Sequence, residues 1–148
     1  MTTTHRTGAD GSPEPVVGAI LLRDDRVLLG YRHPAREHFP ACWDVPGGHI
    51  EAGETAHGAL RRELLEEIGV DVEVGERDAD FRIRAAHYDL ELWVVRSWQG
   101  EVTNRDPQEH AELGWFKDEE LGSLPLADAQ YLDFLTAALK SERPQAQP

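Results

Sequence analysis

The sequence predicts one α+β domain in which a mixed β-sheet lies between helices. The apolar, β-branched run at residues 16–22 is typical of a strand, and so is the segment 87–98, which alternates at its start and looks buried at its end. Segments 55–68 and 128–140 instead repeat their apolar residues at helical spacing. With 148 residues, 40% of them hydrophobic, the chain has the size of one domain with one core. Helices that bury one stripe on a sheet give the α+β class.

The expected elements follow the chain from a polar arm to a polar tail. Both ends, residues 1–15 and 141–148, are rich in Pro and small polar residues and are predicted to be disordered. The folded domain is expected at residues 16–140. In order, we expect strands at 16–22 and 27–32 around a turn at Asp24–Asp25, a short strand at 43–45, a helix at 55–68, strands at 70–74, 79–84, 87–98 and 112–116, and a helix at 128–140.

The helix at residues 55–68 is predicted to place three acidic side chains on one side. Because a helix turns about 100° per residue, Glu66 lies about −60° and Glu67 about +40° from Glu63. Like charges at this spacing repel one another by roughly a few tenths of a kcal/mol. Solvation of an ordinary surface face relieves such repulsion, and so does a hard divalent cation, which prefers several oxygen ligands.

The loop before this helix favours the second explanation, a bound divalent cation, over a solvated surface face. Pro46, Gly47 and Gly48 form a Pro-Gly-Gly turn in which glycine lets the backbone approach a ligand closely. Such a turn exposes a backbone carbonyl as a further oxygen ligand. Gly69, directly after the helix, suits the left-handed conformation that ends many helices. The unit is therefore a strand, a glycine loop, an acidic helix and a glycine stop.

This unit resembles the sequence signature of the Nudix hydrolases, G-x5-E-x7-R-E-U-x-E-E-x-G-U, in which U is an apolar residue. The segment from Gly48 to Val70 carries it, and every fixed position matches. The matching residues are Gly48, Glu54, Arg62, Glu63, Leu64, Glu66, Glu67, Gly69 and Val70. The resemblance to the MutT-like branch extends to "WQGE" at residues 98–101 and "AELGWF" at residues 111–116.

The resemblance implies an α/β/α sandwich, the Nudix fold, and cleavage of a nucleoside diphosphate linked to a further group. It implies that Glu63, Glu66 and Glu67 bind metal or activate water, that the Gly47 carbonyl also binds metal, and that Arg62 and Glu54 order the loop and the carboxylates. MutT-like enzymes add a glutamate six residues before a tryptophan. Glu109, six before Trp115, is the candidate, and Glu112 in the same acidic segment is its competitor.

These oxygen ligands indicate the cofactor. Carboxylates and a carbonyl suit Mg²⁺, or Mn²⁺, better than Zn²⁺. A carboxylate that is not fully occupied by metal can accept a proton from water, and Glu63, Glu66, Glu67 and Glu109 all remain candidates for this general base. Neither the seven histidines nor Cys42 forms a persuasive ligand set or an activated nucleophile.

Substrate specificity is expected outside the signature. Arg32 and Asp128 stand where MutT-like proteins place residues near the nucleotide, so both are candidate substrate-binding residues; a surface cation and a helix cap are the alternative interpretations. The first expectation is hydrolysis of a nucleoside triphosphate, oxidised or not, to a monophosphate and pyrophosphate. Tyr88 favours a dinucleoside polyphosphate hydrolase instead. A non-catalytic nucleotide-binding domain is the alternative of another class, although no signature glutamate is lost.

Composition limits the partners to small molecules. A formal net charge of −13 is unsuited to long nucleic acid, which requires neutralising Lys and Arg. No apolar run reaches the roughly 18–20 residues of a membrane span. Cys42 is the only cysteine, so no intrachain disulfide is possible, and a cytoplasmic location is expected. The base and the oligomeric state stay open at this point.

Overall fold

The structure is a computed structural model that describes residues 11–37 and 39–141. Its elements in chain order are β1 (Glu14–Arg23), β2 (Arg26–Arg32), β3 (Trp43–Asp44), β4 (Gly47–His49), α1 (Ala56–Ile68), β5 (Phe81–Arg84), β6 (Tyr88–Val95), β7 (His110–Lys117), α2 (Asp118–Leu121) and α3 (Tyr131–Ser141). The disorder expected at residues 1–10 and 142–148 lies outside the described residues. None of the helices within these ranges is long and apolar enough to cross a membrane.

The strands form one mixed sheet with β1 at its centre. The order is β3-β2-β1-β6-β5, and β4 and β7 pair with β1 and β2. β1 runs parallel to β6 from Glu14, opposite Tyr88, to Leu21, opposite Val95. Its first half also pairs antiparallel with β4, where Gly18 lies opposite Gly47. Because β1 touches the glycine loop directly, the position of that loop is fixed by the centre of the sheet.

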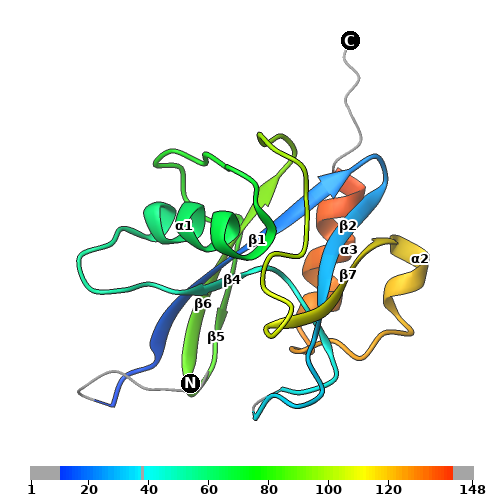
Figure 1. The fold of residues 1–148 in the computed structure, drawn as a ribbon, viewed down its shortest axis with the longest axis horizontal. Helices are drawn as coiled ribbons and strands as arrows, with labels where there is room; N and C mark the ends of the chain where they lie inside the picture. Colours follow the sequence, from blue (N-terminus) through cyan, green and yellow to red (C-terminus); the bar gives the residue numbers. More distant parts are fainter. Residues whose placement is uncertain (1–10, 38, 142–148) are drawn as a thin grey trace.

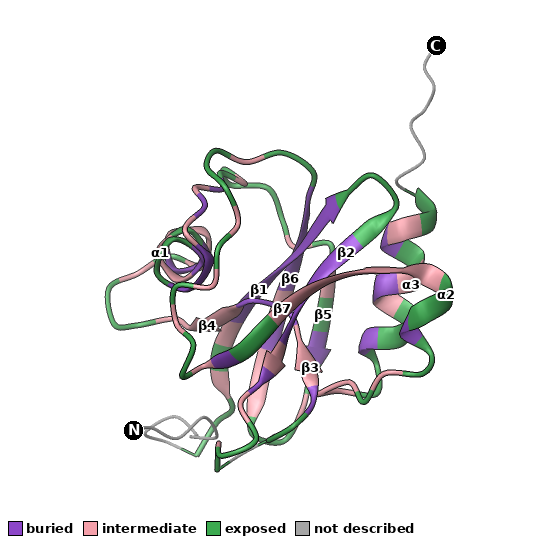
Figure 2. Ribbon diagram, turned by 45° about the vertical axis from the view of Figure 1, so that its right-hand side comes forward, coloured by how far each residue is buried: buried purple, intermediate pink, exposed green. Residues whose placement is uncertain are grey.

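Helices cover both faces of this sheet (Figure 1), so the predicted α+β sandwich is confirmed. Side chains alternate along a strand. Accordingly, Val17, Ala19 and Leu21 of β1 pack with the buried face of α1. Ile20 and Leu22 point the other way and pack with α2 and α3. Burial on both faces explains why β1 is a continuous apolar run, and Figure 2 shows the buried positions concentrated between α1 and α3.

Several expected boundaries were wrong. β1 begins at Glu14, so Glu14 and Pro15 belong to the sheet, where the Pro15 carbonyl accepts the Ile50 N–H at 3.1 Å, and not to a disordered arm. Residues 70–74 form no strand beyond a single bridge from Asp71 to Gln99. The last helix begins at Tyr131 instead of Asp128 and includes Ser141. The short elements β4 and α2 were not expected.

The two neighbouring leucines of α1 test how the helix is anchored. Leu64 is fully buried against the sheet, whereas Leu65 is 40% exposed. Leu64→Ala is expected to lower the free energy of unfolding by about 2–5 kcal/mol, because it leaves a cavity in the core. Leu65→Ala, the same chemical change one residue away, is expected to cost less than about 1 kcal/mol. Urea unfolding measures both, and equal losses would contradict this packing.

Candidate active site

The glycine loop lies so close to its neighbours that side chains are excluded from it. A Cβ on Gly48 would stand 2.3 Å from the carboxylate carbon of Glu63. A Cβ on Gly47 would stand 2.0 Å from the Val17 carbonyl oxygen of β1. The backbone of β4 is therefore enclosed between the central strand and the acidic side of α1.

Both ends of α1 are fixed by local contacts, and the one at Gly69 was expected from the sequence. Thr55 accepts the Gly58 N–H through its hydroxyl oxygen at 3.1 Å. At the other end Gly69 adopts the left-handed conformation, with φ 73°, and its N–H donates to the Leu65 carbonyl. The helix is consequently fixed in rotation, and its three signature glutamates are presented toward β4 and the adjoining solvent.

The three glutamates differ strongly in exposure. Glu67 is buried, and one of its carboxylate oxygens accepts the Gly47 N–H at 3.3 Å. The Glu63 side chain is 15% exposed and is hydrogen-bonded to Glu67, whereas the Glu66 side chain is 60% exposed. The predicted common arc thus divides into a buried pair and one outer carboxylate.

Arg62 connects this group to the loop. Its Nε and Nη2 atoms donate to the two carboxylate oxygens of Glu54, at 2.5 and 2.9 Å, and Nη2 also donates to the His49 carbonyl at 3.2 Å. Its Nη1 atom donates to Glu63 at 3.1 Å and to Glu66 at 3.4 Å. The bidentate pair with Arg62 lowers the pKa of Glu54 to about 2. The residues predicted to order the loop therefore lie where they contact both the loop and the carboxylates.

The buried pair carries unfavourable charge. Burial raises the pKa of Glu67 well above its usual value, and the charges of Glu63 and Glu109 raise it further. Burial also raises the pKa of Glu63. Two carboxylates in hydrogen-bonding contact need a proton or a cation between them, because their like charges repel at short range. A divalent cation on these oxygens would satisfy the same requirement, so the donor set fits a hard metal ion.

Metal binding would require one rearrangement. Within residues 11–37 and 39–141, no three His, Cys, Asp or Glu side chains are already gathered as a metal-binding cluster. Glu66 is the most exposed of the three glutamates, and it shares the Nη1 atom of Arg62 with Glu63. Gathering all three carboxylates around one ion would therefore require the exposed Glu66 side chain to move toward the pair.

Glu109 is better placed than its competitor. It lines the same pocket as Gly47 and Gly48, its charge acts on Glu67, and it pairs with Arg36 at 2.6 Å. Glu112 is exposed in β7, opposite Tyr31 of β2. The structure thus brings Glu109, and not Glu112, to the loop of the signature.

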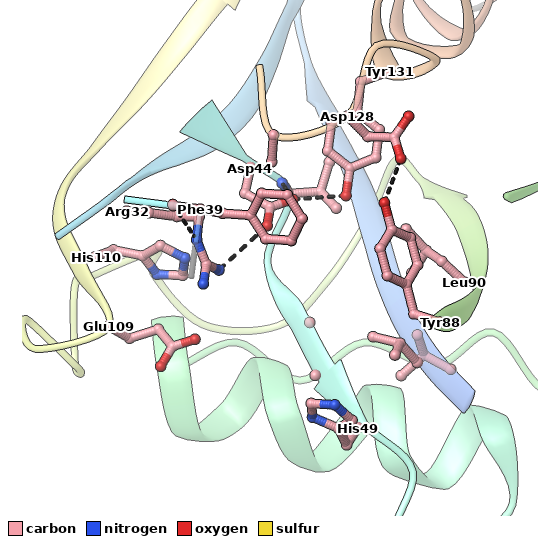
Figure 3. Close-up of a pocket in the computed structure, with 16 residues that line it drawn as sticks. Arg32, Phe39, Asp44, His49, Tyr88, Leu90, Glu109, His110, Asp128 and Tyr131 are labelled. Carbon is pink, nitrogen blue, oxygen red and sulfur yellow. Dashed lines mark hydrogen bonds and ion pairs between the residues drawn. The ribbon is translucent and has the colours of Figure 1, made fainter. Parts of the chain in front are cut away.

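A pocket, called here the central pocket, extends from the glycine loop to the residues before α3 (Figure 3). Both candidate substrate-binding residues line it. Arg32 is buried and donates through Nε to the Phe39 carbonyl at 2.8 Å and through Nη1 to Asp44 at 3.4 Å. Asp128 accepts the Gln130 N–H at 2.8 Å and the hydroxyl of Tyr88. Arg32 is therefore not the surface cation of the alternative interpretation, whereas Asp128 does bond to the backbone of the turn before α3.

Three residues of the central pocket were missed from the sequence. Asp44 is a partly buried acid; desolvation raises its pKa, while Arg32 and a 2.7 Å hydrogen bond from Tyr131 favour its charged form. Tyr131 lies in the segment 128–140, for which the sequence predicted only an amphipathic helix. His110, next to Glu109, is buried, and burial lowers its pKa to about 4, so the ring is neutral at pH 7. The sequence signal that could have pointed to Asp44 is its position as a charged residue between the apolar Trp43 and Val45 in a short strand.

Comparison with known proteins agrees with this geometry. The family model of the NUDIX domain matches residues 12–138. The CTP pyrophosphohydrolase of Escherichia coli strain K12 is 36% identical over 133 residues, covering 87% of this chain and 95% of that protein. The 8-oxo-dGTP diphosphatase of Proteus vulgaris is 36% identical over 92 residues, covering 60% and 80%. A MutT NUDIX hydrolase from Burkholderia pseudomallei has a similar structure, with a TM-score of 0.69, 30% identity and coverage of 87% and 97%.

The matched region includes the whole glycine loop, α1 and the central pocket, and the signature glutamates are all present. These relatives are named as enzymes, so they support a catalytic domain and not a non-catalytic one. The chain belongs to the NUDIX family, in its MutT-like branch, and is a nucleotide pyrophosphohydrolase.

Proposed function

We propose that this enzyme uses Mg²⁺ to hydrolyse a nucleoside triphosphate to a monophosphate and pyrophosphate. The observation that carries the proposal is the buried Glu63–Glu67 pair beside Gly47 and Gly48, at one end of a pocket that Arg32 and Asp128 also line. A pocket with a cation-binding end and a separate polar end suits a phosphorylated ligand with an attached base. The relatives named CTP pyrophosphohydrolase and 8-oxo-dGTP diphosphatase support this class of substrate.

The proposed ligands of the ion are the carboxylates of Glu63, Glu66, Glu67 and Glu109 and the carbonyl of Gly47. The ion would neutralise phosphate oxygens and acidify a bound water. Arg62 holds Glu63 and Glu66 on the loop side and, through Glu54 and the His49 carbonyl, keeps the glycine loop against α1. A carboxylate that is not occupied by the ion accepts the proton of the attacking water.

Glu67 and Glu109, two of the candidates for the general base, differ in their surroundings. Glu67 is surrounded by protein and close to Glu63, so a proton on it is stabilised in the absence of a cation. Glu109 lies across the pocket at the start of β7 and pairs with Arg36. Replacing each in turn and comparing the pH dependence of kcat would separate a ligand from a base.

A dinucleoside polyphosphate is the second candidate substrate. Tyr88, which motivated it, lines the central pocket, but its hydroxyl donates to Asp128. This contact gives the tyrosine a place in the pocket wall that does not depend on a second nucleoside.

The substrate prediction is tested with a panel of nucleotides. The panel contains the four common ribonucleoside triphosphates, the four deoxyribonucleoside triphosphates, 8-oxo-dGTP, ADP-ribose and diadenosine tetraphosphate. Each nucleotide is incubated with Mg²⁺, with and without chelator, and the products are separated by chromatography. We expect a monophosphate and pyrophosphate from at least one triphosphate, and no product with chelator. Exclusive cleavage of diadenosine tetraphosphate would replace the proposal by the second candidate.

The role of Glu67 is tested by Glu67→Gln. The substitution keeps the shape but removes the buried ligand charge, so kcat is expected to fall about 100-fold or more. The metal-free fold should survive, because burial disfavours the charge that is removed. Exposed Glu101 lies outside the site, and Glu101→Gln is the matched control with unchanged kcat.

Metal binding gives this test a second readout. Mg²⁺ at 100 times its dissociation constant stabilises a folded protein by about 2.7 kcal/mol. The melting temperature of the wild type and of the Glu101→Gln control should therefore rise with Mg²⁺, and that of Glu67→Gln should rise much less. Near wild-type turnover together with a full Mg²⁺ effect in Glu67→Gln would remove Glu67 from the metal site.

Asp128 is predicted to contribute to the choice of base. Loss of an acceptor from a base edge costs about 1–3 kcal/mol against the favoured base, so Asp128→Ala should change the ranking of kcat/KM across the panel. The substitution should also lower the melting temperature, because the Gln130 N–H and the Tyr88 hydroxyl lose their acceptor. An unchanged ranking with a lowered melting temperature would leave Asp128 a purely structural role.

A further inference from the structure

Asp44 lies between the two walls of the central pocket (Figure 3). It is the last residue of β3 and pairs in register with Gly30 of β2. Its side chain is 18% exposed, and its two carboxylate oxygens face different partners. Oδ2 faces Arg32, whereas Oδ1 accepts from the Tyr131 hydroxyl and the Val45 N–H.

The first wall is that of Arg32. The Arg32 side chain is 7% exposed, with Nη1 at 3.4 Å from Asp44 and Nε at 2.8 Å from the Phe39 carbonyl. Its guanidinium also lies over the Phe39 ring, 5.9 Å from the centroid. Because an arginine side chain has many rotamers, a carboxylate on one nitrogen and a carbonyl on another restrict where the guanidinium can lie.

The second wall is the short segment from Asp128 to Tyr131. Tyr131 begins α3 and is 5% exposed, and its hydroxyl reaches Asp44, which is 87 residues away in the chain, at 2.7 Å. At the other end of the segment, Asp128 accepts the hydroxyl of Tyr88 in β6. Two tyrosine–carboxylate hydrogen bonds therefore attach this segment to the sheet, one to Asp44 of β3 and one to Tyr88 of β6.

We propose that Asp44 is a positioning residue for nucleotide binding, which fixes Arg32 on one wall of the pocket and the segment that carries Asp128 on the other. The inference rests on the proposed function, because the ligand of the pocket is taken to be a nucleotide. Asp44 contacts Arg32, Tyr131 and Val45, and none of its hydrogen bonds reaches Glu63 or Glu67. Its loss should therefore weaken binding of the nucleoside part more than it slows the chemical step.

Two conservative substitutions separate the two walls. In Asp44→Asn the Oδ1 atom can still accept from Tyr131 and Val45, but an amide group then faces the Arg32 donor, so only the arginine wall is released. Tyr131→Phe removes a single oxygen and releases only the α3 wall. Tyr31→Phe is the matched control, because Tyr31 packs on Trp43 with ring centroids 5.0 Å apart and does not line the pocket.

The measurements are KM and kcat for the best triphosphate of the panel, and the dissociation constant of the corresponding monophosphate with chelator present. For Asp44→Asn and Tyr131→Phe we expect KM and the dissociation constant to rise on the order of tenfold, as for the loss of one charge-assisted hydrogen bond. The value of kcat should stay within about twofold, and Tyr31→Phe should change neither quantity. Melting temperatures of all variants verify the fold.

Three results would overturn the inference: an unchanged KM and dissociation constant in both folded variants, a fall in kcat at constant KM, or an equal effect of Tyr31→Phe. If one variant fails to fold, the other still decides, because each removes a different contact of the same carboxylate. Failure of the proposed function is distinguishable, since the wild type would then release no monophosphate from any triphosphate. A wild type that is active, with variants that bind normally, rejects the positioning role alone.

Discussion

The burial of Glu67 is the constraint on which the site depends. Glu67 follows the core residue Leu64 by one helical turn and precedes Ile68, so the rotation that packs α1 on the sheet also forces a carboxylate into the protein. Its neighbours are a glycine loop and Glu63, and the Gly47 N–H donates to it at 3.3 Å. Burial, together with the charges of Glu63 and Glu109, raises the pKa of Glu67, and the proposed cation would offset the same unfavourable charge.

Arg62 relieves part of the repulsion along the same helix. It contacts Glu54, Glu63 and Glu66 at once, so one positive charge is shared among three carboxylates. Glu63 belongs to this group and also contacts Glu67, so it connects the carboxylates around Arg62 to the buried one. Glu67 has Glu63 and the Gly47 N–H as its partners, and it is the carboxylate at which the proposed cation would offset the most unfavourable charge.

The sequence predicted the local parts of the site and missed the non-local parts. The stop at Gly69 and the presence of the three glutamates on one helix follow from residues that are neighbours in the chain, and the structure has both. Asp44 and Tyr131 are brought together by the sheet and α3, and no periodicity in either segment indicates the contact. The strand expected at residues 70–74 fails for a related reason, because only Asp71 finds a backbone partner, Gln99.

Asp128 shows why structural and functional interpretations of one residue need not compete. The sequence offered a helix cap or a base reader as alternatives. In the structure Oδ1 accepts the Gln130 N–H in the turn before α3, while Oδ2 accepts the Tyr88 hydroxyl inside the pocket. One oxygen orders the entry to the helix, and this order directs the other oxygen to the pocket wall. The contact with the Gln130 N–H is thus part of what places the carboxylate on the pocket wall, where the proposed nucleotide would bind, so one feature can serve both stability and the proposed recognition.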